Sequence, residues 1–315
     1  MALSNLPKFE QAKLLRRFVS GVEKQLKPKH PELISLTIGH RERGGEIIES
    51  ELTLKAVVVK KKDNPAIPLK PFVAKTCANA VVGRKGLTRM IELPVDVVSF
   101  PDAELTSAAN VLNGNKTGCL AGRILWENGE RAWLTVSHLL KFPGTSHVAN
   151  ELTVLNGAVK LPRAQGALWL DDPKAPGCPV DATVVLEKVD MQMYSYWTAA
   201  NISSIYTKKL IGLSGFRFID QNSITHALKF HTSLPAGTLR YSGGYFPEVH
   251  LFQSNYTPCG GDSGGPVWIE SEGEKKLVGI QSAVSDKNFV VIPIASVSRA
   301  FRNSGLMSGI WLRAL

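Results

Sequence analysis

Apolar side chains recur three or four residues apart near the start of the chain, and a proline ends the run. The residues concerned are Phe9, Leu14, Leu15, Phe18, Val22, Leu26 and the closing Pro28. Such spacing places one apolar stripe along a helix, so the pattern predicts an amphipathic helix over residues 8–28.

The next runs are rich in aliphatic and β-branched side chains and predict three strands, at residues 34–38, 51–59 and 90–98. Gly39 and a charged stretch containing Gly44-Gly45 separate the first two strands. We therefore expect these two strands to form a hairpin with a long loop.

From Gly118 onward, short β-type segments are separated by Gly, Pro, Asn and Asp. This texture is typical of antiparallel sandwiches or barrels and not of alternating β and α units. A helix over residues 295–312 is expected to close the chain. The β-type segments are 119–126, 131–137, 152–155, 167–170, 182–189, 210–219, 224–232, 238–241, 266–270, 277–284 and 289–294.

Residues 101–117 are polar and turn-rich, and they separate the two patterns. A chain of 315 residues is long for one domain and sufficient for two. We predict a smaller α+β domain over residues 1–115 and a mainly β domain over residues 116–315. With 44% hydrophobic and 20% charged residues the chain can bury a core, which excludes general disorder.

The formal net charge of +10 raises the question of a nucleic-acid partner. The two basic clusters, at 60–62 and 84–85, sit beside Asn, Pro or Gly, so solvated loops are favoured over a binding patch. No apolar run approaches the roughly 18 residues that span a bilayer, and the chain start lacks the apolar core of a signal peptide. We expect a cytoplasmic protein without a membrane partner.

The four cysteines, Cys77, Cys119, Cys178 and Cys259, are too few and too scattered for a disulfide scaffold. None belongs to a C-x-x-C pair, so neither a structural zinc ion nor any other metal is expected.

The strongest motif is Gly260-Gly-Asp-Ser-Gly-Gly-Pro266. A nucleophilic serine needs a tight turn that exposes its hydroxyl and directs adjacent backbone N–H groups at one point, where an oxyanion can form. The glycines around Ser263 permit such dihedral angles. The motif therefore points to nucleophilic catalysis by Ser263.

This string resembles the active-site loop of trypsin-like and chymotrypsin-like serine peptidases, and the resemblance covers roughly residues 118–312. It implies a chymotrypsin fold: two antiparallel β-barrels, about 118–200 and 205–295, with the site between them. It also implies a hydrolase, a serine protease with a catalytic triad, that needs no cofactor.

Ala132-Trp-Leu-Thr-Val-Ser-His138 is an apolar strand ending in Ser-His, and it resembles the family segment that delivers the catalytic histidine. Asp181 opens Asp181-Ala-Thr-Val-Val-Leu186, which resembles the family's aspartate followed by a short apolar strand. The order His138, Asp181, Ser263 is that of the family. The competing histidines are His147, His226, His231 and His250, and the competing carboxylates are Asp171, Asp172 and Asp190.

The same resemblance implies an oxyanion hole made by the N–H groups of Gly261 and Ser263. It places Thr257 at the base of the specificity pocket and Ser282-Ala283-Val284 on the strand that binds the substrate backbone. With Thr257 in place of a carboxylate and Val284 in place of a glycine, we expect a preference for a small or medium uncharged residue. Asp286 remains an alternative that could reach inward.

The chain departs from secreted family members at the cysteines and at the activation signal. Position 139 is Leu and no cysteine follows Cys259, so the usual disulfides cannot form, which favours a reducing compartment and a free Cys259 thiol. The family's freed Ile-Val-type amino terminus is also missing near residue 118. In the family that amino terminus pairs with the aspartate beside the serine, so we expect Asp262 to have a different partner in this chain.

The upstream block has its own resemblance. Residues 34–39, Gly44-Gly45, 51–60 and Ile67-Pro68 resemble the amino-terminal domain of some bacterial trypsin-like peptidases and of the narrow-leaf peptidase of plants.

The leading hypothesis is an intracellular serine endopeptidase of restricted specificity that acts on a protein or peptide. Its regulation would fall to a protein partner or to the amino-terminal domain. The alternative is a catalytically silent binding or scaffolding protein with a basic amino-terminal domain. Esterase chemistry on the same triad is a third candidate.

Overall fold

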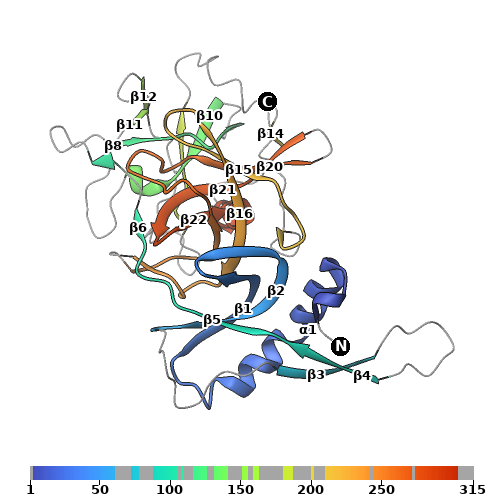
Figure 1. Ribbon diagram of the computed structural model, residues 1–315. Helices are drawn as coiled ribbons and strands as arrows, with labels where there is room; N and C mark the ends of the chain where they lie inside the picture. Colours follow the sequence, from blue (N-terminus) through green and yellow to red (C-terminus); the bar gives the residue numbers. More distant parts are fainter. Residues whose placement is uncertain are drawn as a thin grey trace. The chain divides into compact units, whose positions relative to one another are not determined.

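The computed structural model describes residues 3–60, 72–77, 88–105, 108–109, 116–125, 131–140, 151–154, 159–162, 180–186, 200–201, 210–241, 244–271 and 274–303 (Figure 1). The chain forms two compact units. Residues 1–100 and 230–233 make one, and residues 101–229 and 234–315 make the other. The first unit thus ends earlier than the division predicted at residue 115. The reason is that β6 (Glu104–Leu105) pairs with β21 (Glu274–Ser285) of the second unit.

The predicted first helix is present as α1 (Lys8–Leu26), after a single 3₁₀ turn at Leu3–Asn5. It packs on β1 (Leu33–Arg43) and β2 (Glu46–Val58). Leu15 and Val22 are buried, whereas Phe9 is 69% exposed. The buried stripe therefore begins at Gln11 and Ala12, one turn later than the apolar pattern suggested.

The hairpin of β1 and β2 is confirmed, but the expected long loop is wrong. Both strands continue through the charged stretch and meet at a two-residue turn, Gly44-Gly45, where both residues have positive φ. Arg41 and Arg43 each approach Glu51 to 3.3 Å, so the charges lie across the strand pair and not in a loop.

The run at residues 90–98 forms two strands instead of one, because Pro94 has no N–H to donate. β4 (Thr88–Leu93) pairs with β3 (Phe72–Cys77), and β5 (Val95–Val98) pairs in parallel with β2. Within residues 230–233, Thr232 pairs with Gly39 on the other edge of β1.

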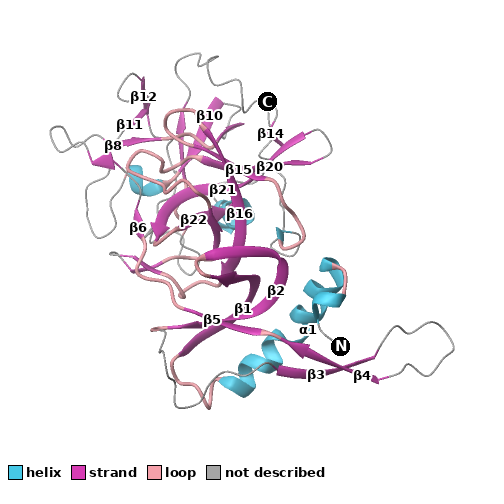
Figure 2. Cartoon of the chain, viewed as in Figure 1, coloured by secondary structure: helices cyan, strands magenta, loops and turns pink. Residues whose placement is uncertain are grey.

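The second unit contains a closed six-stranded antiparallel barrel in the order β15-β20-β21-β22-β19-β16, with β16 returning to β15. The mainly β fold class is therefore confirmed (Figure 2). Besides β21, its strands are β15 (Phe216–Ile219), β16 (Thr225–Leu234, shared with the first unit), β19 (Val249–Gln253), β20 (Pro266–Ser271) and β22 (Asn288–Pro293).

Aromatic rings fill this barrel. Phe216 and Phe252 pack with ring centroids 5.2 Å apart, and Phe218 and Phe289 with centroids 5.1 Å apart. All four side chains are fully buried. Edge-to-face contacts of this kind add to the stabilisation that burial provides.

Two smaller sheets precede the barrel. One joins β9 (Gly122–Leu125), β10 (Arg131–Thr135) and β13 (Thr183–Leu186). The other joins β7 (Ala108–Ala109), β8 (Lys116–Gly118), β11 (Glu151–Val154) and β12 (Val159–Pro162). The predicted strand at 167–170 lies outside the described residues.

Three short strands and a helix complete the second unit. β17 (Arg240–Tyr241) pairs with β18 (Gly244–Tyr245), and β14 (Ala200–Asn201) pairs with β21. The closing helix is α3 (Ile294–Asn303), and the rest of the predicted 295–312 helix lies outside the described residues.

Candidate active site

The histidine singled out in the sequence lies directly after β10. Trp133 and Leu134 anchor this strand in the interior, and a short 3₁₀ turn (Ser137–Leu139) then carries a fully buried His138. The Nδ1 atom of His138 is 2.7 Å from Oδ2 of Asp181, and its Nε2 atom is 2.8 Å from the hydroxyl oxygen of Ser263. One imidazole therefore bridges a carboxylate and a serine hydroxyl.

Asp181 sits within a shell of hydrogen-bond donors. The Ser137 hydroxyl and the His138 backbone N–H donate to Oδ1 at 2.8 and 3.0 Å, and the Ser282 hydroxyl donates to Oδ2 at 2.5 Å. Burial by itself would raise the pKa of Asp181, but the His138 charge and these hydrogen bonds outweigh it and lower the pKa to about 2. The carboxylate is therefore ionised at neutral pH, although it is fully buried.

Two consecutive tight turns present Ser263. In the first, the Asp262 N–H donates to the Cys259 carbonyl, and in the second the Gly265 N–H donates to the Asp262 carbonyl. Gly261 and Gly264 occupy the third positions with φ of +103° and +90°. A β-carbon on Gly264 would also collide with the Cys119 carbonyl and the Thr135 hydroxyl, so the motif's glycines meet a steric requirement.

Backbone hydrogen bonds anchor these turns on both sides. The Cys119 N–H donates to the Ser263 carbonyl at 2.7 Å, and Gly264 and Gly265 exchange 2.8 Å bonds with Gln281 of β21. The Ser263 hydroxyl oxygen also lies 3.3 Å from the carbonyl oxygen of Ser282. Ser263 is thus fixed between β21 and the chain segment that precedes β9.

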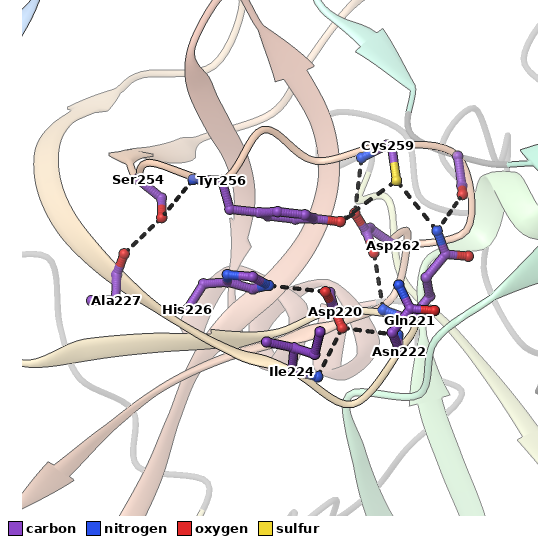
Figure 3. Close-up of polar contacts among 11 residues, drawn as sticks. Asp220, Gln221, Asn222, Ile224, His226, Ala227, Ser254, Tyr256, Cys259 and Asp262 are labelled. Atoms are coloured by element: carbon purple, nitrogen blue, oxygen red, sulfur yellow. Dashed lines mark hydrogen bonds and ion pairs between the residues drawn. The ribbon is translucent and has the colours of Figure 1, made fainter.

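Asp262, whose partner the sequence left open, is held by neutral donors. The Tyr256 hydroxyl and the Cys259 N–H donate to Oδ2 at 2.5 and 2.8 Å, and the Gln221 N–H donates to Oδ1 at 3.0 Å. Figure 3 shows these contacts converging on the carboxylate from two loops. The Gln221 side chain also donates to the Gly260 carbonyl at 3.0 Å.

The Tyr256 ring packs against a second aromatic ring, that of His226. It stacks on the His226 ring with centroids 4.0 Å apart, and His226 Nε2 lies 2.9 Å from Oδ2 of Asp220 (Figure 3). No motif or spacing in the sequence singled out Tyr256, Gln221 or Asp220. A Tyr six residues before an Asp is a weak signal unless the loop between them is known to fold back.

The structure places the other predicted site residues as follows. Ser282 contacts both Asp181 and Ser263, so it belongs to the hydrogen-bonded cluster and not only to the strand expected to bind substrate. Ala283 is buried and Val284 half-buried in β21, next to Ser282. Thr257 is exposed beside Tyr256, and Asp286 is exposed in the turn between β21 and β22 with φ of +53°.

The competing histidines lie elsewhere. Burial lowers the pKa of His250 to about 3, so this side chain is neutral in the interior. His231 is buried within residues 230–233 of the first unit, and His226 pairs with Asp220. His147 and the three competing aspartates, Asp171, Asp172 and Asp190, lie outside the described residues.

No family model matches this chain, and no curated protein matches it. Among solved structures, it is similar to the inactive form of a serine-to-alanine mutant of Rv3671c from M. tuberculosis, with 11% identity and a TM-score of 0.37. That match covers 65% of this chain and 88% of the other.

It is also similar to an inactive mutant of a chimeric NS6 protease of murine norovirus, with 9% identity and a TM-score of 0.32. This match covers 57% of this chain and 87% of the other. At such identities and scores, neither protein's activity carries over to this chain.

The described residues hold no group of three or more His, Cys, Asp or Glu side chains that could bind a metal ion. In the same part of the chain, no helix combines the length and the apolar character needed to cross a membrane.

Proposed function

We propose that this chain is a serine endopeptidase that cleaves peptide bonds through an acyl-enzyme. The observation that carries the proposal is the single imidazole of His138 lying within hydrogen-bond distance of both Asp181 and Ser263. The three residues come from separate parts of the sequence, so their meeting does not follow from any one motif. Their geometry matches the requirements of a nucleophile, a base and an orienting carboxylate.

In the proposed reaction, the Ser263 oxygen attacks the carbonyl carbon of the scissile bond while Nε2 of His138 accepts the hydroxyl proton. Asp181 holds the Nδ1–H of the imidazole and stabilises the imidazolium that forms. His138 then donates the proton to the departing amine. A water molecule, deprotonated in turn by His138, releases the acyl group and restores the Ser263 hydroxyl.

The developing oxyanion is assigned to the N–H groups of Gly261 and Ser263. The two glycine turns fix the backbone on each side of Asp262, and three donors hold the Asp262 carboxylate. We propose that Tyr256 presets this loop in the role that a freed amino terminus has in the secreted peptidases. Preorganised donors of this kind are worth about 10²–10³-fold in turnover each.

The substrate proposed is an extended protein or peptide segment with a small or medium uncharged residue before the scissile bond. The competing proposal of a silent binding or scaffolding protein requires that Ser263 be unreactive. Esterase activity would use the same three residues. Reactivity of Ser263 therefore separates the first proposal from the second, and a comparison of peptide and ester substrates separates it from the third.

The test is covalent labelling by an alkyl fluorophosphonate, in which the Ser263 oxygen bonds to phosphorus and fluoride leaves. The full chain should be labelled at Ser263, and Ser263→Ala should not be labelled. Ser296→Ala, which removes a hydroxyl of α3 that donates to Glu248 at 3.2 Å, is the matched control and should be labelled like the wild type. Absence of labelling in the folded wild type would refute the enzyme proposal.

A further inference from the structure

The edge of β21 next to Ser263 is already occupied by another segment of the chain. β6 pairs with it antiparallel, with Leu105 opposite Ala283 and Glu104 opposite Val284. β20 covers the same region of β21 only as far as Ile280, so this stretch of edge would otherwise be open. An open strand edge offers unpaired N–H and C=O groups to any extended chain.

The occupied stretch begins one residue after the contact with the nucleophile. The Ser263 hydroxyl oxygen lies 3.3 Å from the carbonyl oxygen of Ser282, and Ala283 and Val284 follow directly. An extended peptide whose scissile carbonyl lies at Ser263 would run along the same two residues. A substrate strand and β6 therefore compete for one set of backbone groups.

Two further contacts hold the β6 segment. The Ser285 hydroxyl donates to the Pro101 carbonyl at 2.7 Å, and the Ala103 N–H donates to the Arg240 carbonyl at 2.7 Å as part of a parallel bridge between Ala103 and Tyr241. Ala103 is buried, whereas Glu104 is exposed and Leu105 half-buried. Residues 101 and 103 are thus held by hydrogen bonds to Ser285 and Arg240, whereas residues 104 and 105 are held by their pairing with β21.

We propose that residues 101–105 form a self-inhibiting strap that must leave the Ala283–Val284 edge before an extended peptide can bind. The strap rests on the proposed function, because it regulates access to the same site. It lowers the fraction of molecules competent to bind a peptide, and therefore the apparent affinity for peptides. Its backbone pairs are with Ala283 and Val284, so labelling by a small reagent that needs no strand pairing should be unaffected.

The test compares two covalent probes on the full chain. One is the alkyl fluorophosphonate, and the other is a tripeptidyl diphenyl phosphonate with valine at the reactive position, which needs the β21 edge. Ser285→Ala removes the hydrogen bond to the Pro101 carbonyl, and Ala103→Pro removes the N–H that donates to the Arg240 carbonyl. Both should accelerate labelling by the peptidyl probe about threefold to tenfold, the effect of losing one hydrogen bond, and leave alkyl labelling unchanged.

Thr37→Ala is the matched control, because Thr37 also donates a 2.7 Å bond to a carbonyl, that of Ser233, in the first unit. It should change neither rate. The proposal is overturned if both probes respond equally, if peptidyl labelling is unchanged, or if it slows, since a slower rate would make β6 part of the binding site. An unreactive Ser263 is a different result, namely no labelling by either probe in any variant.

Amide hydrogen exchange supplies an independent measurement on the wild type. Glu104 and Leu105 should exchange faster in the peptidyl adduct than in the free protein, and at the free-protein rate in the alkyl adduct. Equal protection in all three states would show that β6 stays in place when a peptide binds, and would overturn the strap.

Discussion

The hydroxyl of Tyr256 donates to Oδ2 of Asp262 at 2.5 Å, and Asp262 directly precedes Ser263. Burial, followed by the hydrogen bond to Asp262, raises the pKa of Tyr256 above its ordinary value. The hydroxyl therefore remains a donor at neutral and moderately alkaline pH. A single side-chain contact links Asp262, the residue beside Ser263, to the stacked rings of Tyr256 and His226.

Tyr256→Phe should lower turnover about tenfold, because it removes one hydrogen bond to a charged group and keeps the ring stacked on His226. The measurement is the turnover number and KM on a peptide substrate, and KM should change less than turnover. Tyr245→Phe, at an exposed tyrosine, should behave like the wild type. An equal loss in both variants, or a loss confined to KM, would contradict the positioning role of Tyr256.

Asp181 should make the stability of the second unit depend on acid pH. Its folded pKa of about 2 lies below the unfolded value of about 3.9, so its contribution is fully present above that value and is lost as the pH falls through 2. Between pH 5 and pH 2 the wild type should lose about 2 kcal/mol more unfolding free energy than Asp181→Asn. Urea unfolding followed by tryptophan fluorescence measures the difference.

The exposed Asp286 provides the comparison for this experiment. Asp286→Asn should keep the acid dependence of the wild type. If Asp181→Asn also keeps it, the carboxylate is not held in its ionised form by the surrounding donors.

Gly264→Ala should destabilise the second unit by about 3 kcal/mol or more, since it adds a collision with Cys119 and Thr135 to an unfavourable φ. Gly237→Ala separates the two effects. Gly237 has φ of +77° and open space around it, so this variant should cost only about 1–2 kcal/mol. Similar losses in both would mean that backbone conformation alone, and not close packing, requires Gly264.

Profiling against a peptide library should show a graded preference for small or medium uncharged residues before the scissile bond. One methylene of misfit in such a pocket is worth about 1–3 kcal/mol, which gives a graded and not an absolute selection. A dominant preference for Arg or Lys would mean that the assignment of Thr257 fails. Asp286→Ala should then weaken cleavage after basic residues most.

The sequence predicted best what depends on short stretches of neighbouring residues. The 3.6-residue spacing over residues 8–28 produced the helix, and the apolar strand before His138 and the glycine motif around Ser263 were both local patterns. β19 was not predicted. All five of its residues are buried, so its sequence lacks the alternation of apolar and polar side chains that marks a half-exposed strand. The two-residue turn at Gly44-Gly45 was hidden by charged strand ends that resemble a loop.

What could not be predicted arises from contacts between distant segments. Ser137 and Ser282 meet at Asp181 from different elements, and no spacing in the sequence relates them. The same is true of Tyr256 and Asp262, whose contact depends on the loop folding back on itself. Thr257, chosen by resemblance, is exposed one residue away from the side chain that makes the contact.

The four residues 230–233 have a consequence for the order in which the chain can fold. They belong to the first unit, where Thr232 lies opposite Gly39 of β1 and the Ser233 carbonyl accepts from Thr37. During synthesis, residues 1–100 leave the ribosome long before this segment does. The first unit therefore lacks the segment that pairs with this edge of β1 until much of the second unit has been synthesised.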